Sequence, residues 1–342
     1  MQGIVFPGGS QAQLEAFPDP EPGYGEVVVR IRSSGMCGSD LHSYRAPTPA
    51  ADGHRLLIQG HEPCGVVDSV GPGVPPSVVE VGDRVMIHHY WGCGSCVDCR
   101  SGWPQLCRVI DPRVPTLNEH GGHTSLMKLP AMQTLPLPDE LSFKAGAALG
   151  CSVGTAWGAL ARLGDVAGRN LVVVGLGPVG TSTTMLAAAL GARVIAVDIA
   201  PRRLDRARRF GAHMVVNSAQ EDLAGAVGDL TGGRGAELLV ETSGSTAAAG
   251  QALESLATWG KACFVGIGAD VQFNTRDTLR RQLTLLTSWT MSTIEQLRCA
   301  RFAVEHDLPL DDLFTHTWSL QQASEAYEWF NGQSDGKGVF EL

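Results

Sequence analysis

The sequence predicts a two-domain protein in which a β-rich N-terminal domain precedes a doubly wound α/β domain. Its 342 residues exceed the length, about 250–300, at which a single hydrophobic core stops growing. The first half contains short apolar segments broken by glycine and proline, the pattern of strands and turns. From about Gly154 onward, apolar strands alternate with glycine turns and alanine-rich helices, which is typical of a parallel sheet with crossover helices.

The N-terminal domain, 1–153, is expected to be all-β or barrel-like. Its candidate strands include Glu26–Ile31, Gly65–Val70 and Asp83–Ile87. The segment 291–342 is too short to build a core of its own. We therefore expect this segment to pack on the N-terminal domain.

The second domain, 154–290, is expected to contain six strands, most of them followed by a helix. The candidate strands are Leu171–Gly175, Arg193–Asp198, His213–Asn217, Ala236–Glu241, Lys261–Gly266 and Leu283–Ser288. Six strands at this spacing predict the doubly wound sheet of dinucleotide-binding domains.

Composition and charge exclude several classes of function. The formal net charge is −9, and the one basic run, Arg202–Arg209, falls in an expected helix, so no nucleic-acid surface is predicted. Met1–Ser10 lacks the features of a signal peptide, and no apolar run reaches the roughly 18–20 residues of a membrane helix. We expect a soluble cytoplasmic protein without nucleic-acid or membrane partners.

A glycine turn follows the first strand of the second domain. Gly175, Gly177 and Gly180 form a G-x-G-x-x-G pattern that also contains Pro178 and Val179 and leads into a helix. The first glycine permits the tight turn, the second lets a pyrophosphate approach, and the third lets helix and strand pack closely. An ordinary glycine-rich loop is the alternative.

An acid at the end of the next strand supports the nucleotide-binding interpretation. Asp198 lies eighteen residues beyond Gly180, where a carboxylate accepts a hydrogen bond from the ribose 2′-hydroxyl and repels a 2′-phosphate. NAD is therefore favoured over NADP. Arg202 and Arg203 could instead receive a 2′-phosphate, or they could form a solvated helix face.

Four of the nine cysteines lie in the fifteen residues from Cys93 to Cys107. In a large intracellular protein such a cluster is more often a metal site than a set of disulfides. Four thiolates suit a closed tetrahedral zinc site. A ferredoxin-type iron–sulfur site is the main alternative, but its last cysteine follows after three residues and precedes proline, whereas here seven residues intervene and Arg108 follows. The predicted ligands are Cys93, Cys96, Cys99 and Cys107.

Three further motifs have ordinary explanations when each is taken alone, such as buried thiols and a core histidine. They are Cys-Gly-Ser-Asp-Leu-His at 37–42, Gly-His-Glu at 60–62 and Gly-Cys-Ser-Val-Gly at 150–154. Together with Gly-Asp-Arg-Val at 82–85, the cysteine cluster and the glycine turn, they make the chain resemble the zinc-containing medium-chain dehydrogenase/reductase family, which includes alcohol and polyol dehydrogenases. The resemblance covers nearly the whole chain.

The resemblance implies a GroES-like catalytic domain, a Rossmann coenzyme domain and two zinc ions per chain. Cys37, His61 and Cys151 would hold a catalytic zinc with one open position, and the cysteine cluster would hold a structural zinc. Glu62 would lie beside the catalytic metal and replace a ligand transiently. Asp40 would accept a hydrogen bond from His61 and so orient its ring.

The resemblance also implies a hydride transfer in which zinc stabilises the deprotonated alcohol and a nicotinamide accepts the hydride. Ser39 would take the hydroxyl proton and pass it through the nicotinamide ribose towards His42. Without zinc, these two residues would be a turn serine and a surface histidine. Further residues expected near the cofactor are Thr242 within Glu241–Gly244, and Gly266, Ile267 and Gly268 within Val265–Gly268. Lys337 is expected either to approach the cofactor or to be a surface lysine.

Two cues to the substrate disagree. Cys151 is typical of simple alcohol dehydrogenases of this family, whereas Cys-Gly-Ser-Asp is common among polyol enzymes. His88 and His89 precede the cysteine cluster where a substrate wall is expected, and histidine there favours a hydroxylated substrate. Glu119, His120 and His123 are expected to add polarity to the same cleft. A polyol, sugar or cyclitol is therefore favoured over an ethanol-like substrate.

Two other functions remain as alternatives. Zinc-free reductases of the same superfamily lack the cysteine ligands, and a non-catalytic nucleotide-binding protein would not need Cys37, His61 and the proton relay. A homodimer or homotetramer is expected, with Leu283–Ser288 as a possible contact strand.

Overall fold

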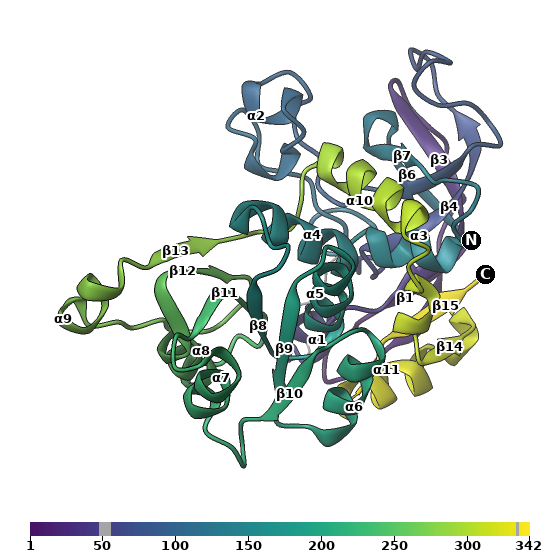
Figure 1. Ribbon diagram of the computed structural model, residues 1–342. Helices are drawn as coiled ribbons and strands as arrows, with labels where there is room; N and C mark the ends of the chain where they lie inside the picture. The colour runs from purple at the N-terminus through teal and green to yellow at the C-terminus, as the bar shows by residue number, and fades with distance from the viewer. Residues whose placement is uncertain (48–55, 333–334) are drawn as a thin grey trace. The chain divides into compact units, whose positions relative to one another are not determined.

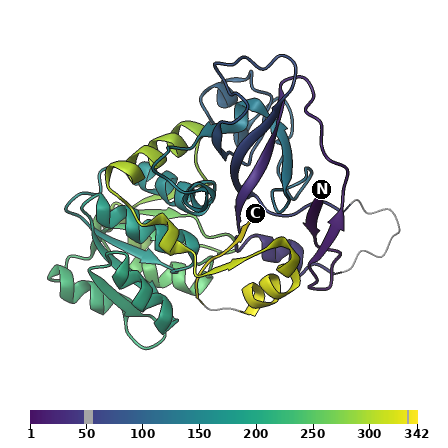
Figure 2. The same ribbon diagram turned by 90° about the vertical axis from the view of Figure 1, so that its right-hand side faces the viewer.

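The computed structural model describes residues 1–47, 56–332 and 335–342, and its chain forms two compact units (Figure 1). Unit 1 contains Met1–Cys151 and Ser292–Leu342, and unit 2 contains Ser152–Met291. The C-terminal segment belongs to unit 1 because its last strand, β15 (Gly338–Glu341), pairs antiparallel with β3 (Glu26–Gly35). Figure 2 shows this C-terminal strand beside the long N-terminal strand.

Unit 1 is built on a seven-stranded sheet in the order β14-β15-β3-β4-β5-β7, with β6 also paired to β3. All neighbours are antiparallel except β14 and β15. Most residues of β3 are buried, and Val27, Val29 and Ile31, which share one face of the strand, enter a core that also holds Trp91. The other strands are β4 (Glu62–Val70), β5 (Arg84–Ile87), β6 (Leu126–Pro130), β7 (Thr134–Pro136) and β14 (His316–Trp318), with a separate pair of β1 (Gln2–Val5) and β2 (Gln13–Ala16).

Short helices connect and cover these strands. Helix α10 begins after Ser292, whose hydroxyl accepts a hydrogen bond from the amide of Glu295 and so caps the helix. The helices of unit 1 are α1 (Asp40–Tyr44), α2 (Val97–Arg100), α3 (Phe143–Leu149), α10 (Thr293–Glu305) and α11 (Ala323–Gly332), with 3₁₀ turns at Pro104–Leu106, Ala131–Gln133, Leu310–Leu313 and Leu320–Gln322.

Unit 2 is a six-stranded, fully parallel sheet in the order β10-β9-β8-β11-β12-β13. This order reverses between β8 and β11, which is the doubly wound arrangement of dinucleotide-binding domains. Every residue of the central strand β8 is buried, as expected when helices cover both faces of a sheet. The strands are β8 (Asn170–Val174), β9 (Arg193–Asp198), β10 (Met214–Asn217), β11 (Ala236–Glu241), β12 (Leu256–Phe264) and β13 (Thr284–Thr287).

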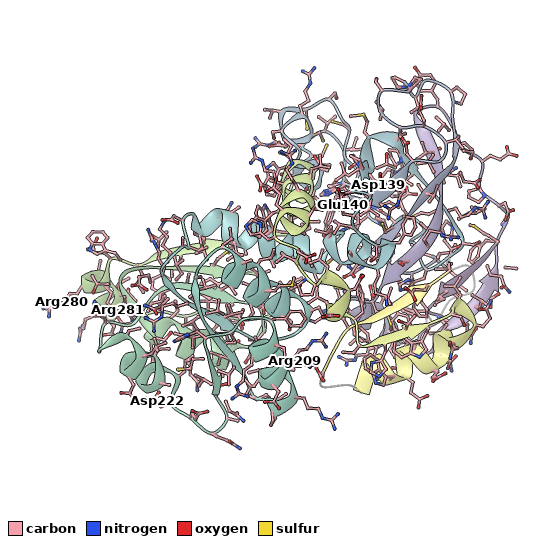
Figure 3. All side chains as sticks on the ribbon, turned by 45° about the vertical axis from the view of Figure 1, so that its right-hand side comes forward. Asp139, Glu140, Arg209, Asp222, Arg280 and Arg281 are labelled. Atoms are coloured by element: carbon pink, nitrogen blue, oxygen red, sulfur yellow. The ribbon has the colours of Figure 1, made fainter. Side chains whose placement is uncertain are left out.

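The helices of unit 2 follow the crossover pattern. Asp222, which is labelled in Figure 3, accepts hydrogen bonds from the amides of Ala224 and Gly225 at the start of α7. Gly232 ends that helix in a left-handed conformation. The helices are α4 (Ser152–Leu163), α5 (Pro178–Ala189), α6 (Pro201–Arg209), α7 (Leu223–Thr231), α8 (Thr246–Glu254) and α9 (Thr275–Thr278), followed by a 3₁₀ turn at Leu279–Arg281.

The predicted fold class is confirmed, and all six predicted parallel strands are present. The prediction for β12 was wrong at its start, because the strand begins at Leu256 rather than Lys261. The first part of β12 contains exposed residues around Trp259, whose φ is +65°. Because these residues do not form a continuous apolar run, the sequence pattern did not reveal the start of the strand. No helix among the described residues is long and apolar enough to cross a membrane.

Candidate active site

Four predicted metal-site residues meet inside unit 1. Cys37 follows β3, His61 and Glu62 lie at the start of β4, and Cys151 follows α3. Each offers one ligand atom, and these atoms all lie within 4.8 Å of one another. The sulfurs of Cys37 and Cys151 are 3.9 Å apart. Two sulfurs on one tetrahedral zinc, at a Zn–S distance of about 2.3 Å, would be about 3.8 Å apart, so the cluster fits this ion.

Asp40 fixes the orientation of His61. One carboxylate oxygen lies 3.0 Å from His61 Nδ1, and the other accepts a hydrogen bond of 2.8 Å from the backbone amide of Cys37. Because Nδ1 is engaged, Nε2 is the nitrogen left for a metal. Asp40 is itself buried and lies on the side of the His61 ring that carries Nδ1.

A buried chain of hydrogen bonds continues behind Asp40. The hydroxyl of Tyr327 donates to Asp40 at 3.3 Å, His123 Nε2 lies 2.8 Å from that hydroxyl, and Ser34 Oγ lies 2.8 Å from His123 Nδ1. His123 is fully buried, so it cannot form the polar substrate wall that the sequence suggested. The residues near it in sequence are also engaged, since Glu119 pairs with Arg113 and His120 accepts from the Ile58 amide.

Glu62 and Lys337 form a buried ion pair beside the same cluster. Lys337 Nζ lies 2.5 Å from Glu62 Oε2 and donates at 2.8 Å to the carbonyl of Met36. Burial raises the pKa of Glu62 to about 7 despite the opposing charge of Lys337. The other oxygen, Oε1, has no hydrogen-bond partner among the described residues. The expectation of a surface lysine was wrong, because Lys337 is only 1% exposed and neutralises an acid 275 positions away (337 − 62).

The electrostatics of the cluster favour a cation. A hydrogen bond from Cys151, together with the charges of His61 and Lys337, lowers the pKa of the Cys37 thiol well below its ordinary value. Asp40 and Glu62 add negative charge, and Lys337 balances only part of it. A divalent cation is therefore the kind of group that this donor set accommodates, and the unpartnered Oε1 of Glu62 is a further oxygen ligand within reach.

The second predicted metal site is formed by Cys93, Cys96, Cys99 and Cys107 around α2. Their sulfurs also lie within 4.8 Å of one another, with 4.0 Å between Cys93 and Cys99 and between Cys96 and Cys107. Backbone amides donate to these sulfurs, for example Cys96 to Cys93 at 3.3 Å, which stabilises thiolates. Four sulfur donors fill a tetrahedral zinc, so this cluster suits a structural ion.

The two predicted proton-relay residues lie on the exposed side of α1. Ser39 occupies the position before the helix, and its side chain makes no capping hydrogen bond there. Both Ser39 and His42 are exposed. The Ser39 hydroxyl is therefore available to an outside group, while His42 has access to water.

The glycine turn of unit 2 has the geometry needed for a phosphate. Gly175 has a φ of +83°, and a Cβ on Gly180 would lie 1.8 Å from the Gly175 carbonyl, so neither position tolerates a side chain. A Cβ on Gly177 would meet open space. Helix α5 begins at Pro178 and Val179 without a side-chain cap, which leaves its first amides for an anion.

Asp198 lies at the end of β9 and is 6% exposed. Its carboxylate accepts from the Leu176 amide at 2.7 Å and from the Ala200 amide at 2.9 Å, and Arg203 Nη1 lies 3.5 Å away. The acid thus ties the glycine turn to the strand end. A carboxylate has about four acceptor positions, so capacity remains for a ribose hydroxyl.

The other predicted cofactor residues lie at the carboxyl ends of β11 and β12. Thr242 donates at 2.6 Å to the Gly175 carbonyl, so its hydroxyl holds the glycine turn. A Cβ on Gly266 would lie 2.2 Å from the Gly244 amide, and Gly268 has a φ of +112°. Ile267 is exposed. Strand ends of this kind are where ligands bind in doubly wound sheets.

Comparison with known proteins agrees with this geometry. Residues 23–139 match the family model of the alcohol dehydrogenase GroES-like domain, and residues 178–304 match that of zinc-binding dehydrogenases. An uncharacterized zinc-type alcohol dehydrogenase-like protein of Escherichia coli K12 is 36% identical, covering 99% of this chain and 98% of the relative. The chain belongs to the zinc-containing medium-chain dehydrogenase/reductase family.

Other members of the zinc-containing medium-chain dehydrogenase/reductase family extend the comparison. An alcohol dehydrogenase of Geobacillus stearothermophilus is 32% identical over 96% of both chains. The crystal structure of galactitol-1-phosphate dehydrogenase from Escherichia coli superposes with a TM-score of 0.89 at 25% identity, covering all of both chains. This chain is therefore a zinc-type oxidoreductase of the alcohol dehydrogenase class.

In this member of the family, the two consecutive histidines have different surroundings. His88 is fully buried and its Nδ1 lies 3.0 Å from Gln296 Oε1, so it lies inside the core of unit 1 rather than on a substrate wall. His89 Nδ1 donates at 2.9 Å to the Gly150 carbonyl, and its ring centroid is 5.1 Å from that of His61. Burial lowers the pKa of His89 well below its ordinary value, so its ring is neutral and Nε2 is an acceptor.

Proposed function

We propose that this protein is a zinc-dependent, NAD-linked dehydrogenase that oxidises an alcohol, with a polyol, sugar or cyclitol favoured. The observation that carries the proposal is the convergence of Cys37, His61, Glu62 and Cys151. A zinc ion held there would supply the positive charge that stabilises a deprotonated hydroxyl, while a bound nicotinamide would accept the hydride. A second zinc at the four-cysteine cluster would be structural.

The chain's own residues would position and deprotonate the substrate. Asp40 holds the His61 ring, so its Nε2 stays directed at the cluster. The uncapped hydroxyl of Ser39 accepts the substrate proton and gives up its own towards His42, which releases it to water. Glu62 offers an additional oxygen through its unpartnered Oε1.

The preference for NAD rests on Asp198, and it leads to a testable prediction. Asp198→Asn keeps an acceptor for the Leu176 amide but removes the charge that repels a 2′-phosphate. We expect kcat/KM for NADP relative to NAD to rise by about tenfold, the value of one hydrogen bond to a charged group. Asp205→Asn removes an exposed acid from the same unit and should leave the ratio unchanged. An unchanged ratio in Asp198→Asn would place the ribose elsewhere.

The preference for a hydroxylated substrate rests on His89, whose neutral ring offers an acceptor beside His61. The structural similarity to galactitol-1-phosphate dehydrogenase supports a polyol. A simple alcohol dehydrogenase is the second candidate, because Cys151 is typical of that group and the Geobacillus stearothermophilus relative carries that name.

The proposal is tested by zinc analysis and a substrate panel on the purified protein. We expect two zinc ions per chain, one for each cluster, and NAD reduction with xylitol, sorbitol or myo-inositol. Higher kcat/KM for short unbranched alcohols than for every polyol would select the second candidate. A single zinc and no turnover with any alcohol would contradict the dehydrogenase proposal.

We further propose a cytoplasmic homodimer or homotetramer that acts on small molecules. All nine cysteines are free thiols in the structure, which suits a reducing compartment. Strand β13 forms one edge of the parallel sheet and carries partly exposed leucines, the kind of edge that pairs with a second copy.

A further inference from the structure

A chain of buried polar side chains in unit 1 leads from the C-terminal helix to the proposed metal cluster. Its members are Ser34 on β3, His123 ahead of β6, Tyr327 on α11, Asp40 at the start of α1, and His61 immediately before β4. Each of these side chains belongs to a residue that is at most 8% exposed. Helix α11 thus supplies the middle member of a chain whose last member, His61, is a proposed zinc ligand.

The hydrogen bonds of this chain all point in one direction. A carboxylate only accepts, so the 3.3 Å contact makes the Tyr327 hydroxyl a donor to Asp40. The Tyr327 oxygen is then left to accept, and its donor is His123 Nε2 at 2.8 Å. Burial lowers the pKa of His123 to about 4, so its ring is neutral and Nδ1 accepts from the Ser34 hydroxyl at 2.8 Å. Each proton therefore lies on the side that faces Asp40.

Asp40 receives donors on both of its carboxylate oxygens. Oδ2 accepts from Tyr327 and, at 2.8 Å, from the backbone amide of Cys37. Oδ1 lies 3.0 Å from His61 Nδ1. The two donors at Oδ2 fix the carboxylate at its far end, which leaves Oδ1 directed at the His61 ring. A carboxylate held in this way fixes the tautomer of a metal-binding histidine and raises the basicity of its other nitrogen.

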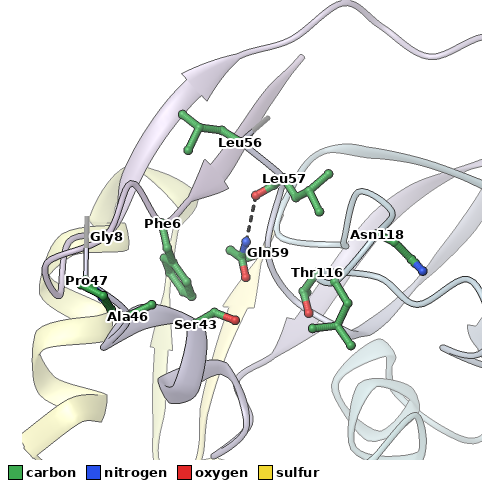
Figure 4. A pocket seen from close by; sticks show the side chains of 11 residues that line it. Phe6, Gly8, Ser43, Ala46, Pro47, Leu56, Leu57, Gln59, Thr116 and Asn118 are labelled. Carbon is green, nitrogen blue, oxygen red and sulfur yellow. Dashed lines mark hydrogen bonds between the residues drawn. The ribbon is translucent and has the colours of Figure 1, made fainter. Parts of the chain in front are cut away.

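Packing holds the Tyr327 ring in place. The ring is fully buried and meets Phe6, which also lines the pocket shown in Figure 4, edge-on with 4.6 Å between centroids. It also stacks on Tyr44 with 5.5 Å between centroids. The His123 ring is closely enclosed as well, because a Cβ on Gly60 would lie 2.3 Å from its Nδ1. The chain is therefore a preformed part of the fold.

We propose that Tyr327 is a positioning residue for the metal, which strengthens zinc binding at the cluster of Cys37 by holding Asp40 against His61. The inference rests on the proposed function and deepens it, because it makes the C-terminal helix part of the support of the metal site. His123 acts through Tyr327, since its Nε2 proton occupies the hydroxyl oxygen and keeps the hydroxyl proton directed at Asp40. Tyr327 itself contributes no ligand atom to the cluster.

The test removes only the hydroxyl, with Tyr327→Phe, and measures the Kd of each zinc by competition with a chromophoric chelator. Cys37→Ser, which lacks a ligand of one cluster, assigns the two zinc ions. We expect the Kd at the cluster of Cys37 to rise about tenfold, the lower end of the effect of residues behind a metal ligand, because 3.3 Å is long for an O–H donor. The four-cysteine cluster is the internal reference and should keep its affinity.

Two further variants separate positioning from general stability. Tyr44→Phe is the matched control, because it removes a phenolic hydroxyl from the same aromatic core and leaves the chain intact, so both affinities should stay unchanged. Tyr327→Phe leaves His123 Nε2 without its acceptor, which costs stability. The double variant Tyr327→Phe/His123→Leu removes this stranded donor. Its urea midpoint with excess zinc should recover towards that of the parent, while its zinc affinity at the cluster of Cys37 should stay low.

The outcomes also separate the inference from the proposed reaction. Selective weakening at the cluster of Cys37 in both Tyr327 variants would support the inference, and only the dehydrogenase proposal would fall if the protein then oxidised no alcohol. Equal weakening at both clusters, or recovery of zinc affinity together with stability in the double variant, would show a merely structural role. Unchanged affinities would overturn the inference alone. A parent protein that binds zinc only at the four cysteines would overturn both proposals.

Discussion

Replacing Cys37 with serine is expected to lower the zinc content from about two ions per chain to about one and to abolish NAD-linked turnover. The thiol of Cys37 lies 3.9 Å from that of Cys151 and has a strongly lowered pKa, so it is the readiest thiolate donor of its cluster. A Lewis-acid metal stabilises the charge of the transition state by several kcal/mol. We therefore expect kcat/KM to fall by at least about a thousandfold. Elemental analysis and steady-state kinetics measure both effects.

The control for this variant is Cys299→Ser, which alters a buried free thiol of unit 1 outside both clusters. It should keep both zinc ions and most of the activity. Cys96→Ser should instead lose the proposed structural zinc of the four-cysteine cluster and keep the zinc at the cluster of Cys37. If Cys37→Ser retained the zinc content and turnover of the parent, the convergence of residues at 37, 61, 62 and 151 would not be a metal site.

At pH 9, well above the Glu62 pKa of about 7, replacing Lys337 with methionine is expected to lower the apparent free energy of unfolding by about 3 kcal/mol, because it leaves the buried carboxylate of Glu62 without its partner. The loss should shrink as the pH falls towards 7, because Glu62 then takes up a proton. The double variant Lys337→Met/Glu62→Gln removes both charges and should recover most of this loss. Urea denaturation followed by circular dichroism measures the three values.

A surface ion pair provides the comparison. Lys144 lies 3.5 Å from the exposed Glu341, and such pairs contribute about 0–1 kcal/mol. Lys144→Met should therefore change stability little. A loss below about 1 kcal/mol in Lys337→Met at pH 9 would mean that Glu62 is neutral in the folded protein even there, and would contradict the buried ion pair.

The features that the residue pattern alone predicted are encoded in contiguous residues, whereas the cluster of Cys37, His61, Glu62 and Cys151 was expected only from the family resemblance. The glycine turn at 175–180 and the cysteine cluster at 93–107 each depend on spacing within one segment, and the structure gathers them as local units. The six parallel strands were visible because buried strands are continuous apolar runs. The start of β12 was missed because its first residues are exposed and interrupted near Trp259.

The features that the sequence did not predict depend on long-range pairs. Lys337 meets Glu62, and Tyr327 meets both His123 and Asp40, through strand and helix packing that no local pattern records. His123 was expected to add polarity near the substrate cleft, and Lys337 was expected to approach the cofactor or to lie on the surface, where polar residues are commonest. Both side chains are instead buried.

The division of unit 1 into two chain segments has a consequence for the order of events on the ribosome. Cys37, His61 and Cys151 emerge before any of unit 2, whereas Lys337 and β15 emerge only after all of it. Until then the Ser33–Gly35 end of β3 lacks its β15 partner, and Glu62 lacks its counter-charge. Because domains fold as they emerge during synthesis, a nascent chain stopped near residue 330, whose last few tens of residues are still inside the ribosome, would already have the four-cysteine cluster and the complete parallel sheet outside it. The proposed metal site at Cys37, His61 and Cys151 would be completed only when the final strand has been added.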